Sequence, residues 1–497
     1  MTNHGTRNAD SAIGPTSARR VSNEPGELRA LLIGVLIVVS LDTELLTVIP
    51  LLRNIEHEFH LSLTQGAWAL SATGIAAGAS IPLLTRLGDI YGLRRLLLIT
   101  LAIVTIGNII CAVSTGPVMF IIGRSVVGVN AALPLYYAVL RAVSPSQQAI
   151  DRFVGVMTAA IGVAVSVSFL LGGIIVNAGG SARTTLWIIA GLSTLVLALV
   201  AVMVDEVPIR VVAAVDWLGG LLLAGGLALL VAGIGQGNAW GWKSGSVTSM
   251  LSGAVVLLAA WVVWEMRCRH PLIDLHTIFR RDMWPAFTVA ALAFVNGVNS
   301  LLVISTFVQT PPVAGYGFGA SVLKTTVYLL PASVMIAFGG RLVTPLVERW
   351  GERTMILVGG GIGAAVFLWF SMADWSKGEF VFFSFMLGAV YAVLCTAGIT
   401  GYLRAARPGE QGMVTGAARS AASAIGAIGP ALITALLTAS FVPKTPIPEK
   451  HNYGHVWLMM FIVALLIIIC GFFLRESKFD QRPTDDVIDT RLHEASS

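Results

Sequence analysis

Two carboxylates interrupt a run of apolar residues near the start of the chain. The stretch LIVVSLDTELLTVIP, residues 36–50, belongs to a run long enough to cross a bilayer, yet it contains Asp42 and Glu44. A carboxylate at the centre of a bilayer costs about 2.5 to 3.5 kcal/mol on insertion scales, so such acids usually face a cavity and mark ion or substrate pathways. Residues two apart on a helix point to roughly opposite sides, so both acids cannot face one cavity. The other acid would face a neighbouring helix or the outer rim of the cavity.

Arg124 is the basic residue best placed to meet these acids. Counted from opposite membrane edges at about 1.5 Å per residue, Asp42 lies about 20 Å into the first span and Arg124 about 12 Å into the fourth. In a core of about 30 Å they fall at nearly the same depth, so an ion pair, direct or through water, is feasible. A carboxylate balanced between burial and a guanidinium can load and release a proton. The alternative is a pair that only ties the two spans together.

A second group of polar residues lies inside other apolar runs. Their amide, phenol, or guanidinium groups could line a cavity, although hydrogen bonds between helices explain each of them at least as well. The candidates are Asn130, Tyr136, Tyr137, Asn296, Asn299, Gln309, Tyr328 and Arg419.

The elements that must position these residues are membrane-spanning helices. Hydrophobic residues make up 56% of the 497 residues, charged residues make up only 12%, and the mean hydropathy is +0.81. These values lie far outside the usage of soluble domains. Backbone groups in lipid must be hydrogen-bonded internally, so the apolar runs, about fourteen in number, are predicted to be helices. The predicted fold class is an all-α membrane protein.

The distribution of basic residues predicts the orientation of the helices. Most lysines and arginines outside the apolar runs fall in loops that share a side with the N-terminus, so both termini are expected in the cytoplasm. The polar segments 1–27 and 475–497 are predicted to be disordered cytoplasmic tails. The net charge of +5 reflects this bias and gives no evidence for nucleic-acid binding. The expected location is the plasma membrane, which is the inner membrane of a bacterium.

Two loops indicate an internal repeat. TRLGDIYGLRR, residues 85–95, and TPLVERWGERT, residues 344–354, superpose without a gap and keep an acid, an aromatic residue, a glycine and a base in order. Two parallel halves are therefore expected, a common plan in secondary transporters, whose binding site lies at mid-membrane between the halves. The predicted division is a six-helix bundle at 28–204, two linker spans at 205–270 and a second six-helix bundle at 271–474.

The first of these loops resembles the signature loop of the major facilitator superfamily, although Thr85 replaces its first glycine. In that family the loop is thought to act as a cytoplasmic latch, which suits an acid near a helix N-terminus and nearby loop bases. The alternative is that the arginines only set the topology. The gate residues implied by the resemblance are Asp89, Gly92 and Arg94, with Glu348 and Arg353 at the matching positions of the repeat.

Other motifs extend the resemblance. GRSVVG, which contains Arg124, resembles the family's fourth-span motif, and the stretch around Asp42 resembles the first-span pattern of its fourteen-span drug:proton antiporter branch. The resemblance implies a proton-coupled exporter of amphipathic or cationic small molecules that works by alternating access. It favours Asp42 as the cavity residue. The feasible pairing makes Asp42 and Arg124 candidates for proton coupling, with Glu44 as a further candidate. The fifth span departs from the pattern, because SFLLGG at 168–173 lacks the usual Gly-Pro pair, which occurs instead at 429–430.

Other functions stay open or are disfavoured. The missing Gly-Pro favours a symporter or uniporter for a small metabolite, and a transport-inactive receptor or scaffold on the same fold is a further alternative. GGGIGAA at 359–365 fits a nucleotide-binding pattern but lies in an apolar run, where close helix packing explains it better. No enzyme activity, cofactor or metal is expected, and the expected partners are a small-molecule substrate, protons and the lipid bilayer. A monomer is the default for this resemblance.

Overall fold

The computed structural model describes residues 25–143, 147–206, 215–269, 271–372, 375–406 and 411–474. These residues are helical apart from connecting loops and one isolated β-bridge between Phe441 and Pro448. Within them, thirteen helices are long and apolar enough to cross a membrane, or fourteen if one bent pair forms a single span. The predicted all-α membrane fold is thus confirmed. The expected tails lie outside the described residues, except that the first helix already begins at Pro25.

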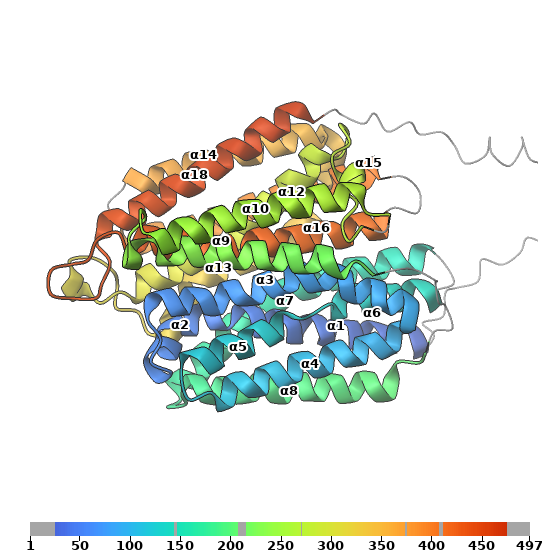
Figure 1. The fold of residues 1–497 in the computed structure, drawn as a ribbon, viewed down its shortest axis with the longest axis horizontal. Coiled ribbons are helices and arrows are strands. Elements are labelled where there is room, and N and C mark those ends of the chain that lie inside the picture. The colour runs from blue at the N-terminus through green and yellow to red at the C-terminus, as the bar shows by residue number, and fades with distance from the viewer. Residues whose placement is uncertain are drawn as a thin grey trace, which may run out of the picture.

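Two groups of helices form the body of the molecule, one below and one above in Figure 1. The first group is α1 (Pro25–Leu46), α2 (Val48–Glu58), α3 (Leu63–Tyr91), α4 (Leu93–Val113), α5 (Pro117–Gly128), α6 (Ala132–Val143), α7 (Gln147–Asn177) and α8 (Ala182–Met203). The second is α11 (Leu275–Ile278), α12 (Trp284–Gln309), η1 (Pro312–Ala314), α13 (Val322–Trp350), α14 (Glu352–Met372), α15 (Lys377–Ala405), α16 (Gln411–Gly426), α17 (Ile428–Leu437) and α18 (Lys450–Phe473). We call them the N-half and the C-half.

Three spans in the described part of the chain are interrupted, each about four residues before a proline. A proline cannot donate to the carbonyl four residues earlier, and its ring clashes with that carbonyl. The pairs are Leu46 with Pro50, Asn130 with Pro134, and Gly426 with Pro430. The first break bends α2 by 47° relative to α1. Pro82, Pro331 and Pro345 lie inside unbroken helices, so local packing decides whether a proline becomes a break.

The two repeated loops have the same backbone geometry. Gly92 joins α3 to α4 with φ of 111°, and Gly351 joins α13 to α14 with φ of 80°. The amide of each glycine donates to the carbonyl four residues earlier, at 3.0 Å and 2.9 Å. Side chains other than glycine enter this region of φ only with strain. The glycine that aligns in sequence therefore performs the same turn in both halves.

The halves meet along two pairs of helices. α7 packs along α13, and α3 packs along α16 and α17. At the first contact the backbones approach closely, since a Cβ atom placed on Gly162 would lie 2.0 Å from the Cα of Ala337. Both ends of the described chain, the start of α1 and the end of α18, lie at the right-hand end of Figure 1.

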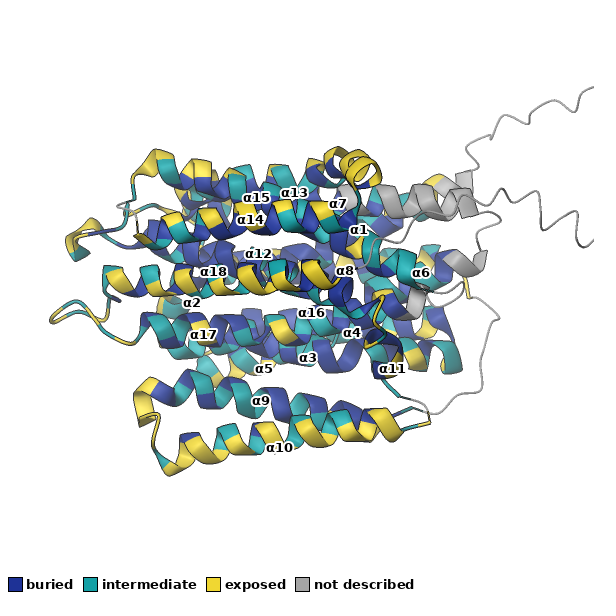
Figure 2. Ribbon diagram, turned by 90° about the horizontal axis from the view of Figure 1, so that it is seen from above, coloured by how far each residue is buried: buried dark blue, intermediate teal, exposed yellow. Residues whose placement is uncertain are grey.

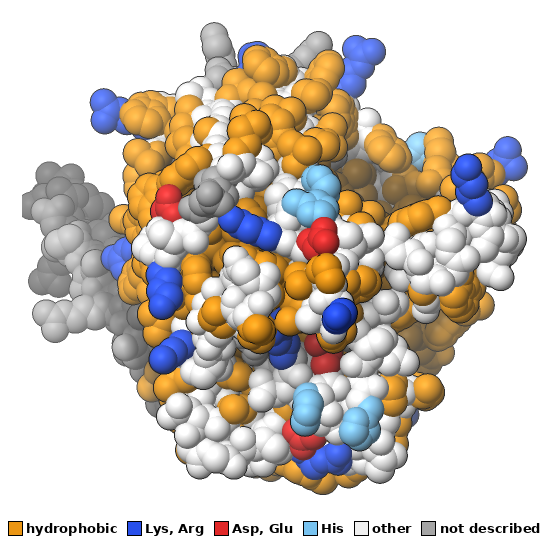
Figure 3. All heavy atoms as spheres, turned by 90° about the vertical axis from the view of Figure 1, so that its left-hand side faces the viewer, with side chains coloured by type: hydrophobic (Ala, Val, Ile, Leu, Met, Phe, Trp, Pro, Cys, Tyr) orange, Lys and Arg blue, Asp and Glu red, His pale blue; other side chains and the backbone are white. Residues whose placement is uncertain are grey.

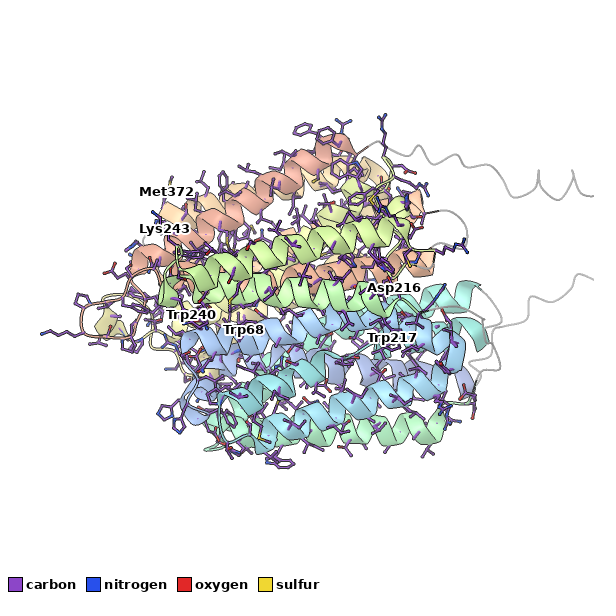
Figure 4. The ribbon with its side chains drawn as sticks, viewed as in Figure 1. Trp68, Asp216, Trp217, Trp240, Lys243 and Met372 are labelled. Atoms are coloured by element: carbon purple, nitrogen blue, oxygen red, sulfur yellow. The ribbon has the colours of Figure 1, made fainter. Side chains whose placement is uncertain are left out.

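The remaining helices, α9 (Trp217–Trp240) and α10 (Gly245–Arg267), form a hairpin at the edge of the bundle. α9 packs against α3 and α17, whereas α10 is the outermost helix in Figure 2 and is largely exposed. Trp217 and Trp240 mark opposite ends of α9 in Figure 4 and are 59% and 50% exposed. Tryptophans at both ends of an exposed apolar helix are typical of the two membrane interfaces.

Candidate functional site

Glu44 lies inside the N-half, where it faces α4 and α5. Its side chain is only 2% exposed. Oε1 accepts a hydrogen bond from Ser40 Oγ, one turn earlier on α1, at 3.0 Å. Asn108 of α4 also interacts with the carboxylate. Among the described residues Oε2 has no hydrogen-bond partner, so this carboxylate is buried and only partly satisfied.

Arg124 of α5 is the positive charge next to Glu44. It is 1% exposed, and its Nη1 donates to the main-chain oxygen of Glu44 at 2.9 Å, while its Nε donates to that of Ala69 at 3.4 Å. The two charges interact, yet no ion pair within 4.0 Å joins them in the described part of the chain. Nη2 of Arg124, like Oε2 of Glu44, lacks a partner there. Arg124 is therefore bonded to the main chain of Glu44, while its guanidinium and the carboxylate of Glu44 interact without forming an ion pair.

The pair of Asp42 and Arg124 that the sequence made feasible is not formed directly in this structure. The sequence correctly placed Arg124 at the depth of the acids on the first span. In the structure, however, Arg124 contacts that span at Glu44. Asp42, two residues earlier, points away from it and interacts electrostatically with Arg419 of α16 instead. The reason is the 100° step between helix residues, which separates the two acids by about 200° around α1.

The surroundings of Asp42 come from both halves. Asp42 is 9% exposed, and its Oδ2 has no hydrogen-bond partner among the described residues. The guanidinium of Arg419 lies over the ring of Phe294, 5.3 Å from its centroid. Tyr137 of α6 and Tyr391 of α15 also interact with Arg419. One acid, one base and three aromatic rings thus lie together between the N-half and the C-half.

Four of these neighbours escaped the sequence analysis. Asn108 and Tyr391 each lie inside an apolar run, so the rule that selected other embedded polar residues would have found them. Ser40 precedes Glu44 by one helical turn, a spacing that indicates contact. Phe294 gave no signal, because one phenylalanine in an apolar span is unremarkable by sequence.

Four other predicted cavity residues make contacts with nearby protein groups. Asn130 lies at the break of the fourth span, where its Oδ1 accepts from the amide of Ala132 at 2.9 Å and so caps α6. Asn296 donates to a main-chain oxygen of α18 at 3.4 Å, and Asn299 donates to one within α12 at 2.8 Å. The ring of Tyr328 stacks 5.6 Å from that of Phe318.

The predicted gate residues lie at the end of the bundle where the described chain begins and ends. Arg94 donates to the main-chain oxygens of Val204 and Ala201 at 2.5 Å and 2.6 Å, so it binds the end of α8 in its own half. Asp89 and Arg353 are half-buried, and Glu348 is exposed. Gly92 and Gly351 form the two turns already described. Among the described residues, no hydrogen bond connects these loops to the opposite half.

A helical bundle of two repeated halves, with charged side chains buried between and within them at mid-span, is the architecture of a secondary transporter. Comparison with known proteins agrees with this class. The model of the Major Facilitator Superfamily matches residues 32–430. The chain belongs to this superfamily, and it is a multi-pass membrane transporter of that family.

Two similar proteins are named for drug resistance or export. The chain is 28% identical to the multidrug resistance protein Stp of Mycobacterium tuberculosis over 78% of its own length and 72% of that protein. It is 26% identical to the tetracenomycin C resistance and export protein of Streptomyces glaucescens, over 87% of its own length and 80% of that protein.

Solved structures share the fold. A peptide transporter of the POT family, solved in an auto-inhibited form, superposes with a TM-score of 0.64 and 15% identity, covering 92% of this chain and 99% of that one. The human organic anion transporter superposes with a TM-score of 0.59 and 16% identity, over 89% and 100%. At these identities the likeness shows the fold alone.

Proposed function

We propose that this protein exports amphipathic or cationic small molecules across the plasma membrane in exchange for protons, by alternating access. The observation that carries the proposal is the pair of buried carboxylates on one span, which face two different arginines on opposite sides of α1. The names of the two relatives, a multidrug resistance protein and an antibiotic export protein, support the direction of transport.

In this proposal Glu44 carries the proton. A charge buried without a partner is expensive, by several kcal/mol, and a guanidinium out of contact only partly compensates it. We therefore assign a proton to Glu44 in this conformation. A small shift of α1 against α5 would bring Oε2 of Glu44 to the unpartnered Nη2 of Arg124, which would stabilise the carboxylate and release the proton.

Asp42 would contact the substrate. A cationic compound can bind Asp42 in competition with Arg419, and the rings of Tyr137, Tyr391 and Phe294 offer faces for apolar or cationic groups. Because one acid and one base share this site, neutral and zwitterionic compounds fit it without leaving either charge unpaired. Each proton moved through 100 mV is worth about 2.3 kcal/mol and each unit of pH difference about 1.36, enough for a gradient of tens-fold or more.

The proposal includes the orientation and the division of the chain. The end with the basic loops, where α1 begins and α18 ends, faces the cytoplasm, and the substrate leaves at the other end. The bundles are 28–204 and 271–474, joined by the spans of 205–270, and Asp89, Gly92, Arg94, Glu348 and Arg353 close the cytoplasmic side when the conformation reverses. One monomer in the bilayer suffices for this cycle.

Proton flux in everted vesicles tests the proposal. A pH-sensitive dye follows an imposed proton gradient while lipophilic cations and neutral drugs are added to the parent, Asp42→Asn and Glu44→Gln. We expect at least one compound to discharge the gradient with the parent and not with Glu44→Gln. With Asp42→Asn, cations should act only at concentrations at least about tenfold higher, which corresponds to about 1.4 kcal/mol of binding energy. If no compound discharges the gradient, export by proton exchange is wrong.

Proton-coupled uptake is the second candidate, and Arg419 favours it. An anion bound at Arg419 would repel the charge of Asp42 and so favour a proton on that carboxylate, which would then travel with the anion. The same vesicles distinguish this mode, because an anionic compound would then move protons in the same direction as itself.

A further inference from the structure

At one end of the bundle, hydrogen bonds from α2 connect the N-half to the C-half, and we call this connection the fastening. Nη1 of Arg53 donates to the main-chain oxygen of Gln309 at 2.8 Å, and Nη2 donates to Thr310 Oγ1 at 2.9 Å. In return, Nε2 of Gln309 donates to the main-chain oxygen of Pro50 at 3.0 Å. Ser305 Oγ donates to the main-chain oxygen of Ile49, the residue before Pro50, at 3.2 Å. Four hydrogen bonds therefore join α2 of the N-half to the last turn of α12.

Arg53 is chemically suited to this place. α12 ends at Gln309, so the carbonyls of its last turn have no partners within the helix and carry the negative end of the helix dipole. A guanidinium with two donors in a fixed fork can bind such a carbonyl and a neighbouring hydroxyl together. Arg53 thus caps a helix of the opposite half.

The described hydrogen bonds between the halves are confined to this end and to mid-span. Besides those of α2, Thr326 Oγ1 donates to the main-chain oxygen of Phe169 at 2.8 Å, and Ser166 and Ser333 join α7 to α13 at 3.0 Å. Ser420 Oγ of α16 donates to a main-chain oxygen of α3 at mid-span. Figure 3 looks onto the fastened end, where basic, acidic and histidine side chains gather among hydrophobic ones.

The break in the first span separates this fastening from the carboxylates. α1 carries Asp42 and Glu44 and ends at Leu46, and α2 begins at Val48 with a bend of 47°. Thr47, between them, donates from Oγ1 to the main-chain oxygen of Ser168 at 3.0 Å. The bend at Thr47, three residues from Glu44, supplies the hinge that a movement of α2 requires.

We infer that Arg53 is a positioning residue that latches the exit side closed, and that the substrate leaves when α2 swings away from α12. Arg53 itself lines a cavity between the halves at this end, to which Thr306, Thr434 and Tyr453 also contribute. Glu56 also lines it, one turn beyond Arg53 on the same face of α2, and interacts with it. Glu56 gives the guanidinium a second partner within its own half when the latch opens. The assignment of this end to the exit side rests on the proposed orientation. The latch itself rests on the hydrogen bonds of Arg53 with Gln309 and Thr310.

Thiol labelling tests the latch without any substrate or proton gradient. Thr306→Cys places a reporter thiol in the cavity, and a membrane-impermeant maleimide is added to intact cells. In the parent background we expect slow labelling. In Arg53→Ala the rate should rise about tenfold, and Arg53→Lys, which keeps one charge but loses the fork, should give an intermediate rate.

Arg183→Ala is the matched control at the same end. Arg183 lies near Glu58, with Nε 3.5 Å from Oε1, donates to the main-chain oxygen of Ala112 at 3.0 Å and lies over Phe59, all within the N-half. Its loss should leave the labelling rate of Thr306→Cys unchanged. If Arg53→Ala does not fold, Thr310→Val removes one acceptor only and should still raise the rate about two- to threefold.

Three results would contradict this inference. Fast labelling of the parent would show that this end is not closed, and an unchanged rate in both Arg53→Ala and Thr310→Val would show that Arg53 does not hold it. An increase seen only in inside-out vesicles would overturn the assignment of this end as the exit side. Failure of the proton-flux experiment alone would leave the latch standing, because labelling needs neither substrate nor coupling.

Discussion

Each half holds a buried acid beside an arginine, Glu44 with Arg124 in the N-half and Glu352 with the half-buried Arg404 in the C-half, and the two pairs differ in their contacts. In the C-half, Arg404 Nη1 lies 2.6 Å from Glu352 Oε1, and the pair ties α14 to α15. In the N-half, Glu44 and Arg124 are buried more deeply, and Arg124 bonds the main-chain oxygen of Glu44 but forms no ion pair with its carboxylate. Each of the two side chains leaves a polar atom without a partner among the described residues. The ion pair of Arg404 and Glu352 holds two helices together. Glu44 and Arg124 form no ion pair, so in the proposed cycle their contact can change when Glu44 gains or loses a proton.

The largest difference is expected in transport. Arg124→Ala removes the charge beside Glu44 and should lower coupled transport by at least about 100-fold, which corresponds to about 2.7 kcal/mol in the barrier. Arg404→Ala should leave the transport rate per folded molecule within about twofold of the parent. Reconstituted vesicles with measured protein content give both rates. Equal losses in the two variants would remove the distinction between the pairs.

Stability should respond in the opposite order. Arg404→Ala leaves Glu352, which is 4% exposed, without its partner, and should lower the free energy of unfolding by about 2 kcal/mol or more. Glu44→Gln removes a carboxylate that is only partly satisfied, so it should leave the thermal midpoint unchanged or raise it. Thermal unfolding in detergent measures both. A large loss of stability in Glu44→Gln would mean that this acid is structural.

The repeated turns should respond alike, because they have the same geometry in both halves. Gly92→Ala and Gly351→Ala each place a Cβ at a positive φ and should lower stability by about 1 to 2 kcal/mol. The two losses should be similar, because the atoms nearest to the added Cβ at Gly92 belong to the exposed carboxylate of Glu206, which can move away. The same unfolding experiment compares them, with Gly361→Ala as a control that meets no neighbouring atom.

The smallest effect is expected at the break of the fourth span. Asn130→Ala removes the side chain that caps α6 and should lower stability by about 1 kcal/mol, while Asn130→Asp keeps the acceptor and should lower it less. If Asn130 instead contacts the substrate, Asn130→Asp will change the apparent affinity at unchanged stability.

Sequence reasoning predicted what depends on period, composition and aligned motifs. Apolar runs form helices in lipid however these helices pack together. The aligned glycines Gly92 and Gly351 both have a positive φ in the structure. Counting residues along the spans also predicted that Arg124 lies at the depth of the acids on the first span. It could not tell which acid Arg124 meets, because that depends on how α5 and α16 pack around α1.

Contacts between the halves were the part that sequence could not supply. Gln309 was selected as an embedded amide, yet its partner is the main chain of Pro50, and Arg53 gave no signal at all. Such contacts depend on the relative position of the two bundles, which no local sequence pattern encodes. Asn108 and Tyr391, in contrast, were within reach of the rule that selected the other polar residues.

The most direct test of the account is proton release by purified protein. A compound that discharges the vesicle gradient is added to the protein in weakly buffered detergent solution, and the pH change is recorded for the parent, Glu44→Gln and Glu352→Gln. The account predicts release with the parent and with Glu352→Gln, and none with Glu44→Gln although the compound still binds. Undiminished release from Glu44→Gln would contradict it, because the proton would then come from another group.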